Sequence, residues 1–255
     1  MDRKAKILLV LDLNGTLLTR VKQKSEKLAL RANPSAPKQR DFGLPAGGGK
    51  IFLRPYLDTF LDRILACPDF AVGVWTSAKL KNALVMINGA FGCNADRLAF
   101  KWHREQCSDI GSRKSDWSSK KDLRKLWDDP DINGKRMWSE TTYNSENHLL
   151  VPEFVVTDPE FDCLNDTSLL SVVKYLDALR GTDDVRRVLR ERVLFTHNGN
   201  GTRTRLANPD FAIGENDPIL QMFPKNRPLA QSIMEVAADV AVGCGIFERD
   251  MSRQL

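Results

Sequence analysis

Hydrophobic residues occur along the chain in short blocks, separated by polar stretches rich in Gly, Pro and Asn. Two blocks are continuous apolar runs, ILLVL at residues 7–11 and FAVGVWT at residues 70–76. Runs of this kind are typical of strands buried on both faces of a sheet. A third run, HLLVPEFVV at residues 148–156, predicts another strand, with residues 149–154 as its body.

Apolar residues at helical spacing predict helices around these strands. The clearest is YLDTFLDRIL at residues 56–65, which follows Pro55, a residue well suited to the start of a helix. The alternation of strand and helix predicts the α/β class: a mostly parallel, Rossmann-like sheet with helices on both faces and residues 7–11 at its centre. The other predicted helices lie at residues 82–91, 121–127, 169–179 and 229–242, and from residue 184 onward.

The remaining segments show no clear period. Residues 20–49 are polar and rich in Pro and Gly, which predicts a long surface loop, and DDPDING at residues 128–134 predicts a turn. We divide the chain into an α/β domain at residues 1–180 and a C-terminal helical and loop extension of unknown role at residues 181–255.

Composition narrows the class of function. The chain has 255 residues, 42% of them hydrophobic, so a sizeable core can be buried. Lys and Arg exceed Asp and Glu by 38 to 33, an excess that suits an acidic or phosphorylated partner. Because no dense basic run occurs, solvated surface charge is the favoured interpretation, and we predict no direct nucleic-acid binding. Five scattered cysteines and three histidines, without paired spacing, indicate neither a disulfide framework nor a zinc site.

The N-terminal stretch MDRKAKILLVLDL does not predict a targeting segment. Its apolar run is short and Asp12 interrupts it, unlike a signal peptide, and no room precedes the first strand for a mitochondrial presequence. Nor is there a run of about 18 apolar residues that would span a membrane. We expect an intracellular protein, nuclear or cytoplasmic, without a membrane segment; the sequence does not indicate its oligomeric state.

An acidic residue stands at the end of the first predicted strand. In parallel sheets the functional site lies beyond the carboxyl ends of the strands, and both Asp12 and Thr76 fall there. A carboxylate in this place can attack phosphorus to form an aspartyl-phosphate, and it can bind Mg²⁺. The alternative is that Asp12 only caps a turn.

Five stretches of the chain occur in an order that carries a family resemblance: DLNGTLL at 12–18, FLRPYLDTFL at 52–61, VWTSA at 74–78, KDLRKLW at 121–127 and VPEF at 151–154. Together they resemble the haloacid dehalogenase superfamily, in the branch of phosphatases that act on the RNA polymerase II C-terminal domain. The resemblance spans residues 6–179. It implies Mg²⁺-dependent removal of phosphate from phosphoserine or phosphothreonine in a protein partner.

The resemblance also implies roles for single residues. Asp12 would be the nucleophile and a magnesium ligand, and the main-chain carbonyl of Asn14 a second ligand. The hydroxyl of Thr76 and the main-chain N–H of Ser77 would bind the phosphate.

A lysine at the start of the KDL stretch would complete the predicted site. Lys121 would neutralise the phosphoryl oxygens and the Asp12 charge, with neighbouring Lys120 as a second candidate. Arg54 would organise the start of the helix that follows it.

Two departures from the family pattern bear on turnover. Members of the family carry an Asp where this chain has Asn14, and that Asp protonates the leaving oxygen and later activates water. An amide cannot exchange a proton near neutral pH, and the loss of a general acid–base costs about 10²–10⁴ in rate. The turn itself should survive, because Asn and Asp behave alike in turns.

The second departure is an absence. Members of the family have a strand that ends in a D-D-S sequence, whereas here RMWSETTYNSENHLLVPEF at residues 136–154 passes directly to the PEF region. A whole strand beside the nucleophile strand, with the acid that completes the magnesium site, looks deleted. Glu140, Glu146 and Asp158 are nearby acids that could substitute. A natural pseudo-enzyme, a shortened splice form and an imperfect gene model would all produce this gap.

Three hypotheses follow. The first is a Mg²⁺-dependent phosphatase of this branch whose turnover is impaired or lost. The second is a non-catalytic phosphoprotein-binding or scaffold module. The third, ranked last, is a relative of the import-receptor subunit of the mitochondrial inner-membrane translocase, which carries a presequence and a membrane span that we do not find here.

Overall fold

Three parallel strands form the central sheet of the protein. The computed structural model describes residues 6–109, 119–133, 148–180, 182, 184–197 and 205–222. Within them the strand order is β1-β5-β6, with β1 at Ile7–Leu11, β5 at Phe70–Trp75 and β6 at Lys101–Trp102. β1 and β5 pair in parallel, from Ile7 opposite Phe70 to Leu11 opposite Val74. The predicted strands at residues 7–11 and 70–76 are therefore confirmed.

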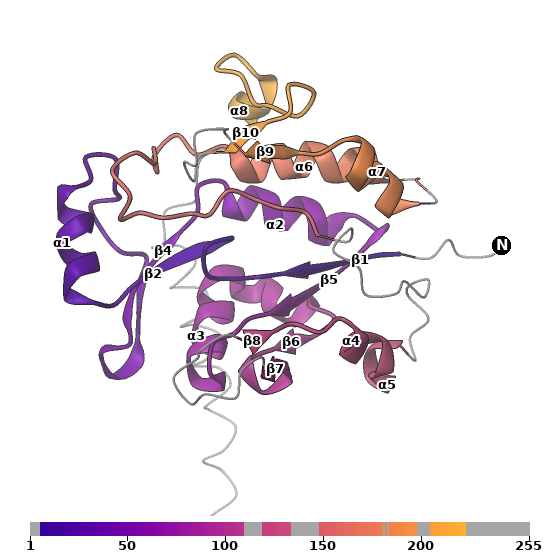
Figure 1. Ribbon diagram of the computed structural model, residues 1–255, viewed down its shortest axis with the longest axis horizontal. Coiled ribbons are helices and arrows are strands. Elements are labelled where there is room, and N and C mark those ends of the chain that lie inside the picture. The colour runs from indigo at the N-terminus through magenta and orange to yellow at the C-terminus, as the bar shows by residue number, and fades with distance from the viewer. Residues whose placement is uncertain are drawn as a thin grey trace, which may run out of the picture.

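Helices pack against both faces of this sheet, as the α/β class requires (Figure 1). Alternate residues of β1 enter different clusters. Ile7, Leu9 and Leu11 pack with α2 (Leu57–Ala66), α3 (Leu80–Phe91) and α6 (Ser168–Leu179), whereas Leu8 and Val10 pack with α4 (Arg124–Asp128) and α5 (Pro130–Asn133). The described ranges also contain α1 (Lys24–Ala32), α7 (Val185–Glu191), α8 (Pro218–Met222) and short 3₁₀ turns at Pro45–Gly47, Gly92–Arg97 and Arg104–Gln106.

The prediction of a long loop at residues 20–49 is wrong. The segment contains α1, strand β3 (Phe42–Leu44), the end of β2 (Leu18–Val21) and the first residue of β4 (Gly49–Leu53); the three strands form an antiparallel sheet in the order β2-β4-β3. No residue of α1 is buried, although Leu30 packs partly against a core cluster, and the mostly polar composition of the segment concealed the helix. Its start is held instead by Glu26, whose carboxylate accepts hydrogen bonds from the main-chain N–H groups of Lys22 (2.7 Å) and Gln23 (2.5 Å).

The prediction of a strand at residues 149–154 is also wrong. Residues 148–155 form no strand pairing, and Pro152 has no N–H to donate to a neighbouring strand. The apolar character of the run has another cause, because Phe154 and Val156 are fully buried in a separate cluster with Val21 and Phe52. A short helix, α5, likewise lies where a turn was predicted at residues 128–134.

β1 lies at the edge of the sheet that the described residues form, not at its centre as predicted. Its pairing with β5 covers one side, and within the described ranges no strand pairs with the other. The expectation that the strand beside the nucleophile strand is missing from the sequence stays a prediction, because residues 134–147 lie outside the described ranges.

The region after residue 180 contributes to the same core. α7 is followed by a hairpin of β9 (Phe195–His197) and β10 (Arg205–Ala207), while β7 (Ser108–Asp109) pairs with β8 (Ser119–Lys120) elsewhere. Leu194, Phe195 and Phe211 join the cluster that α6 forms with the sheet. The domain boundary at 180 stays a prediction, and the helix predicted at residues 229–242 lies outside the described residues. Of the helices that the structure describes, none has the length and apolarity to cross a membrane.

Candidate functional site

Asp12 follows β1 directly and begins a tight turn. The carbonyl of Leu13 accepts main-chain hydrogen bonds from Thr16 (3.2 Å), Leu17 (2.9 Å) and Leu18 (3.1 Å), which curls the chain back on itself. Gly15 has a φ of +83°, a conformation that L-residues rarely adopt. The turn leaves the Asp12 side chain 43% exposed at the carboxyl end of the strand.

Lys121 reaches this carboxylate. Its Nζ lies 2.8 Å from Oδ1 of Asp12, and the same oxygen accepts a hydrogen bond from the Leu13 N–H (2.8 Å). Lys121 stands just before α4, whose Leu126 is buried against Trp75 and so fixes the lysine beside the end of the sheet. Because both partners are partly exposed, the ion pair contributes little to stability. Its significance is that it brings an ammonium group and a carboxylate together at the carboxyl end of β1.

Thr76 and Ser77 follow β5 at the same edge. Since β1 and β5 are parallel neighbours, Asp12 and Thr76 both stand just beyond the carboxyl ends of their strands. Thr76 is 2% exposed, and its Oγ1 accepts a hydrogen bond from the N–H of Ala78 (3.3 Å), so its own proton can still be donated. Ser77 is exposed, and its carbonyl is held by Nε of Arg104 (2.7 Å).

Asn14 serves the turn. Its side-chain Oδ1 accepts a hydrogen bond from the N–H of Arg20 (3.0 Å), and Asn14 forms an isolated bridge with Leu18. The amide thereby links the turn after β1 to strand β2. This is a structural use of the side chain that an Asn performs as well as an Asp.

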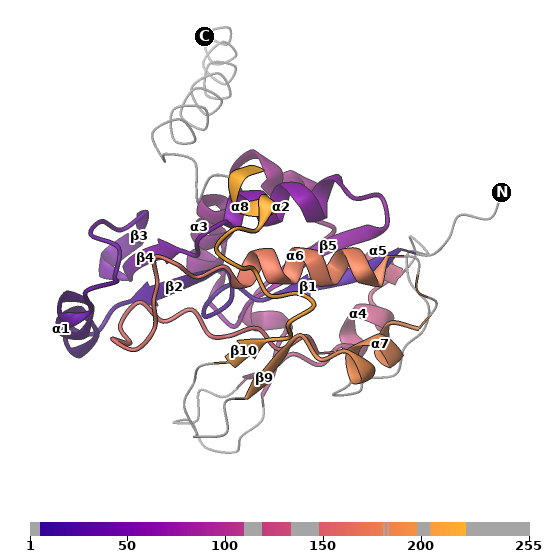
Figure 2. The same ribbon diagram turned by 90° about the horizontal axis from the view of Figure 1, so that it is seen from above.

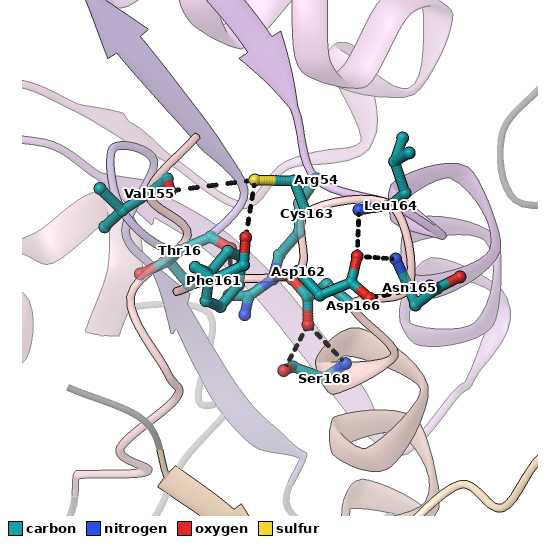
Figure 3. Close-up of polar contacts among 10 residues, drawn as sticks. All are labelled: Thr16, Arg54, Val155, Phe161, Asp162, Cys163, Leu164, Asn165, Asp166 and Ser168. Carbon is teal, nitrogen blue, oxygen red and sulfur yellow. Dashed lines mark hydrogen bonds and ion pairs between the residues drawn. The ribbon is translucent and has the colours of Figure 1, made fainter. Parts of the chain in front are cut away.

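Arg54 ties three segments around the turn (Figure 3). The residue is 0% exposed, and its Nε lies 2.6 Å from Oδ2 of Asp166. Its Nη1 donates a hydrogen bond to the carbonyl of Thr16 (3.0 Å), and its main-chain N–H donates one to the carbonyl of Leu17 (3.0 Å). Its guanidinium carbon lies 5.6 Å from the ring centroid of Phe154.

The sequence placed Arg54 at the helix start but did not reveal Asp166. The two residues are 112 positions apart, so no local pattern links them. Asp166 is held in turn by the N–H (3.0 Å) and hydroxyl (2.6 Å) of Ser168 at the start of α6. The buried pair therefore connects the turn after β1 to the beginnings of both α2 and α6.

An acid that the sequence did not single out lies against the turn. The N–H of Phe154 donates to the carbonyl of Gly15 (2.7 Å), which brings Glu153 over the glycine. A Cβ placed on Gly15 would lie 3.1 Å from Cγ of Glu153. Of the acids considered as substitutes, Glu140 and Glu146 fall outside the described residues, and Asp158 caps a turn by accepting from the N–H of Glu160 (3.0 Å).

A magnesium site is not complete in these residues. Mg²⁺ prefers six oxygen ligands in octahedral geometry, commonly one or two carboxylates with waters and substrate phosphate. The described ranges contain no group of three or more His, Cys, Asp or Glu side chains that could hold a metal. Asp12 offers one carboxylate, of which Oδ1 already contacts Lys121, so this donor set does not fit Mg²⁺ on its own.

The chain matches one known family over most of its length. The family model described as NLI interacting factor-like phosphatase matches residues 7–186, which include every residue of the candidate site. Curated proteins give no match. The parallel sheet, the acid at the end of β1 and this match agree with the resemblance in the sequence, and the chain belongs to the NLI interacting factor-like phosphatases, a family of the haloacid dehalogenase type.

Proposed function

We propose that the protein binds phosphoserine or phosphothreonine of a protein partner at the Asp12 edge of the sheet, as a phosphatase homologue whose turnover is impaired or lost. The observation that carries the proposal is the contact of 2.8 Å between Lys121 Nζ and Asp12 Oδ1, at the carboxyl end of β1 in a chain of this family. A cation fixed there can neutralise a phosphate that approaches the strand end.

Each residue of the site would have a distinct task in binding. Lys121 would exchange its contact with Asp12 for a phosphoryl oxygen, and the Thr76 hydroxyl and Ser77 N–H would donate hydrogen bonds to the others. Asp12 would face the phosphorus as the nucleophile that the family chemistry requires. The buried Arg54–Asp166 pair would hold the turn that carries Asp12 in position.

Turnover would suffer at two steps. Asn14 cannot protonate the leaving alkoxide or activate water against an aspartyl-phosphate, and its amide oxygen already binds the Arg20 N–H. Phosphatases of the haloacid dehalogenase type generally use Mg²⁺, which when bound supplies charge neutralisation. With Asp12 as the only carboxylate that the family resemblance assigns to the metal, we expect Mg²⁺ binding to be weak or absent.

The second candidate is a non-catalytic phosphoprotein-binding or scaffold module. The structural use of the Asn14 amide favours it, because that side chain holds the turn and takes no part in proton transfer. Both candidates share the binding step and differ only in whether phosphate is released.

Binding of a phosphoserine peptide to the full chain, measured by calorimetry without metal, tests the shared step. We expect Lys121→Met to weaken binding about tenfold or more, since a charged hydrogen bond contributes about 1.5–3 kcal/mol. Lys50→Met, which removes an exposed lysine of β4, is the matched control and should bind normally. Asp12→Asn should tighten metal-free binding, because it removes a negative charge that competes for Lys121. Equal affinity for the unphosphorylated peptide would contradict the proposal.

A further inference from the structure

A groove runs along the open edge of β1. It has a volume of about 850 Å³ and is lined by every residue of the strand. One wall is α6, with Leu169, Val172 and Leu176, and the other is α4, with Leu126 and Trp127. Figure 2 shows β1 between these two helices. Apolar side chains dominate both walls and the edge of a strand forms the floor, while charged residues also line the groove: Lys6, Asp12, Lys121, Asp184 and Arg186.

Among the described residues, the main chain of β1 has hydrogen-bond partners on one side only. The N–H of Ile7 donates to the carbonyl of Asp69 (2.8 Å), so Ile7, Leu9 and Leu11 direct their main-chain groups toward β5. Because these groups alternate along a strand, those of Leu8 and Val10 face the groove. Within the part of the chain that the structure describes, no main-chain hydrogen bond reaches them from that side.

We propose that this groove binds an extended polypeptide segment of a partner protein, which adds to β1 as a further strand. Unpaired main-chain N–H and C=O groups on a half-buried strand cost free energy. An extended polypeptide offers C=O and N–H groups at the same spacing and can therefore form hydrogen bonds with all of them. Since apolar side chains dominate both walls, the partner's side chains should be mainly aliphatic on both faces, as in a strand buried within a sheet. The five residues of β1 match the usual length of a strand.

Other occupants fit less well. The free edge lies between two helical walls, so the β1 edges of two copies could not approach each other closely enough to pair. Residues 134–147 (GKRMWSETTYNSEN) are mostly polar and lack the aliphatic character that both walls demand. The groove follows β1 and reaches Asp12 and Lys121 of the candidate phosphate site at the end of the strand. Pairing along the strand needs no phosphate, so the proposal does not depend on the proposed function.

Peptide probes test the proposal on the full, isotope-labelled chain. The probe is an acetylated and amidated peptide of alternating Val and Leu, flanked by lysines for solubility. We expect its binding to slow amide hydrogen exchange at Leu8 and Val10 about tenfold or more, with little change at Ile7 and Leu9, which face β5. Two N-methylated versions serve as a matched pair: methylation of the residues that face β1 should abolish binding, and methylation of the alternate residues should preserve it.

Variants of one helix supply an independent control. Val172→Trp fills the groove and should abolish peptide binding, whereas Ala178→Trp on the exposed side of α6 should leave it unchanged. Should the first variant fail to fold, the N-methylated pair still decides the matter on the unmodified chain. Equal binding of both methylated peptides, exchange at Leu8 and Val10 that is already slow without peptide, or a dimer that protects these amides would each overturn the proposal.

Discussion

The buried pair between Arg54 and Asp166 offers the sharpest test of how the turn after β1 is held. We consider the substitution Asp166→Ala. Arg54 is 0% exposed, and its Nη2 has no hydrogen-bond partner among the described residues, so its charge depends on Asp166 and the Thr16 carbonyl. The substitution would leave a buried guanidinium with no counter-ion.

The expected cost is large. Removal of one partner of a buried ion pair typically costs about 3–5 kcal/mol, because an uncompensated charge remains. Asp166→Ala also removes two hydrogen bonds from Ser168 at the start of α6, which places the effect toward the upper part of that range. Replacement of both charges, Arg54→Met with Asp166→Leu, should cost much less than the sum of the single substitutions, because no lone charge is buried.

Urea unfolding followed by tryptophan fluorescence measures these free energies. The control is Asp96→Ala, which removes the ion pair between Lys101 and a carboxylate that is 94% exposed. We expect that control to change the free energy of unfolding by less than about 1 kcal/mol. Additive effects of the two substitutions at Arg54 and Asp166, or a cost of Asp166→Ala below about 1 kcal/mol, would refute the reasoning.

Three further predictions follow from particular contacts. Gly73→Ala should cost about 1–3 kcal/mol, because a Cβ there would lie 2.2 Å from Cε1 of Phe100 in a packed cluster. The Lys174 ammonium, 2.5 Å from the Asp217 carboxylate, lowers the pKa of that carboxyl. The ion pair should therefore stabilise the protein at neutral pH, and this stabilisation should be lost as pH falls below about 4. In urea unfolding at a series of pH values, Asp217→Asn should lack this acid-dependent loss of stability. Burial raises the pKa of the Cys163 thiol, which should react with a thiol reagent only after unfolding.

Each of these has a matched control in the chain. Gly214 has open space where a Cβ would lie, so Gly214→Ala should be close to neutral; an equal effect of the two glycine substitutions would contradict the packing argument. An acid profile unchanged by Asp217→Asn would show that Lys174 does not stabilise the carboxylate. Cys93 is exposed and should react promptly in the folded protein, and equally fast labelling of Cys163 would disprove its burial.

The sequence predicted the elements that bury a regular apolar pattern. β1, β5, α2 and α6 were found within a residue or two, because each presents its apolar side chains to the core at a fixed period. α1 escaped detection because none of its residues is fully buried and it lies in a mostly polar segment. The run at residues 149–154 misled because apolarity reports burial and not pairing: Phe154 is buried as part of a loop that packs on β2 and β4.

The residues of the candidate site were likewise predictable from the sequence only in part. Asp12, Thr76 and Lys121 could be named because they stand at strand ends or at a helix start that local pattern and family resemblance both mark. Asp166 could not be named, since it meets Arg54 only through tertiary packing. The position of Glu153 over Gly15 likewise depends on how a loop crosses the turn, which no local pattern encodes.

The central claim is that the site keeps the family architecture with its turnover impaired or lost. The most direct measurement is phosphate release from a phosphoserine peptide in the presence of Mg²⁺ by the unmodified chain, Asn14→Asp and Asp12→Asn. We predict a rate at least about 10²–10⁴ below that of a family member with both acids, and little recovery in Asn14→Asp, because the donor set for the metal stays incomplete. A brisk Mg²⁺-dependent rate from the unmodified chain, abolished by Asp12→Asn, would contradict the account.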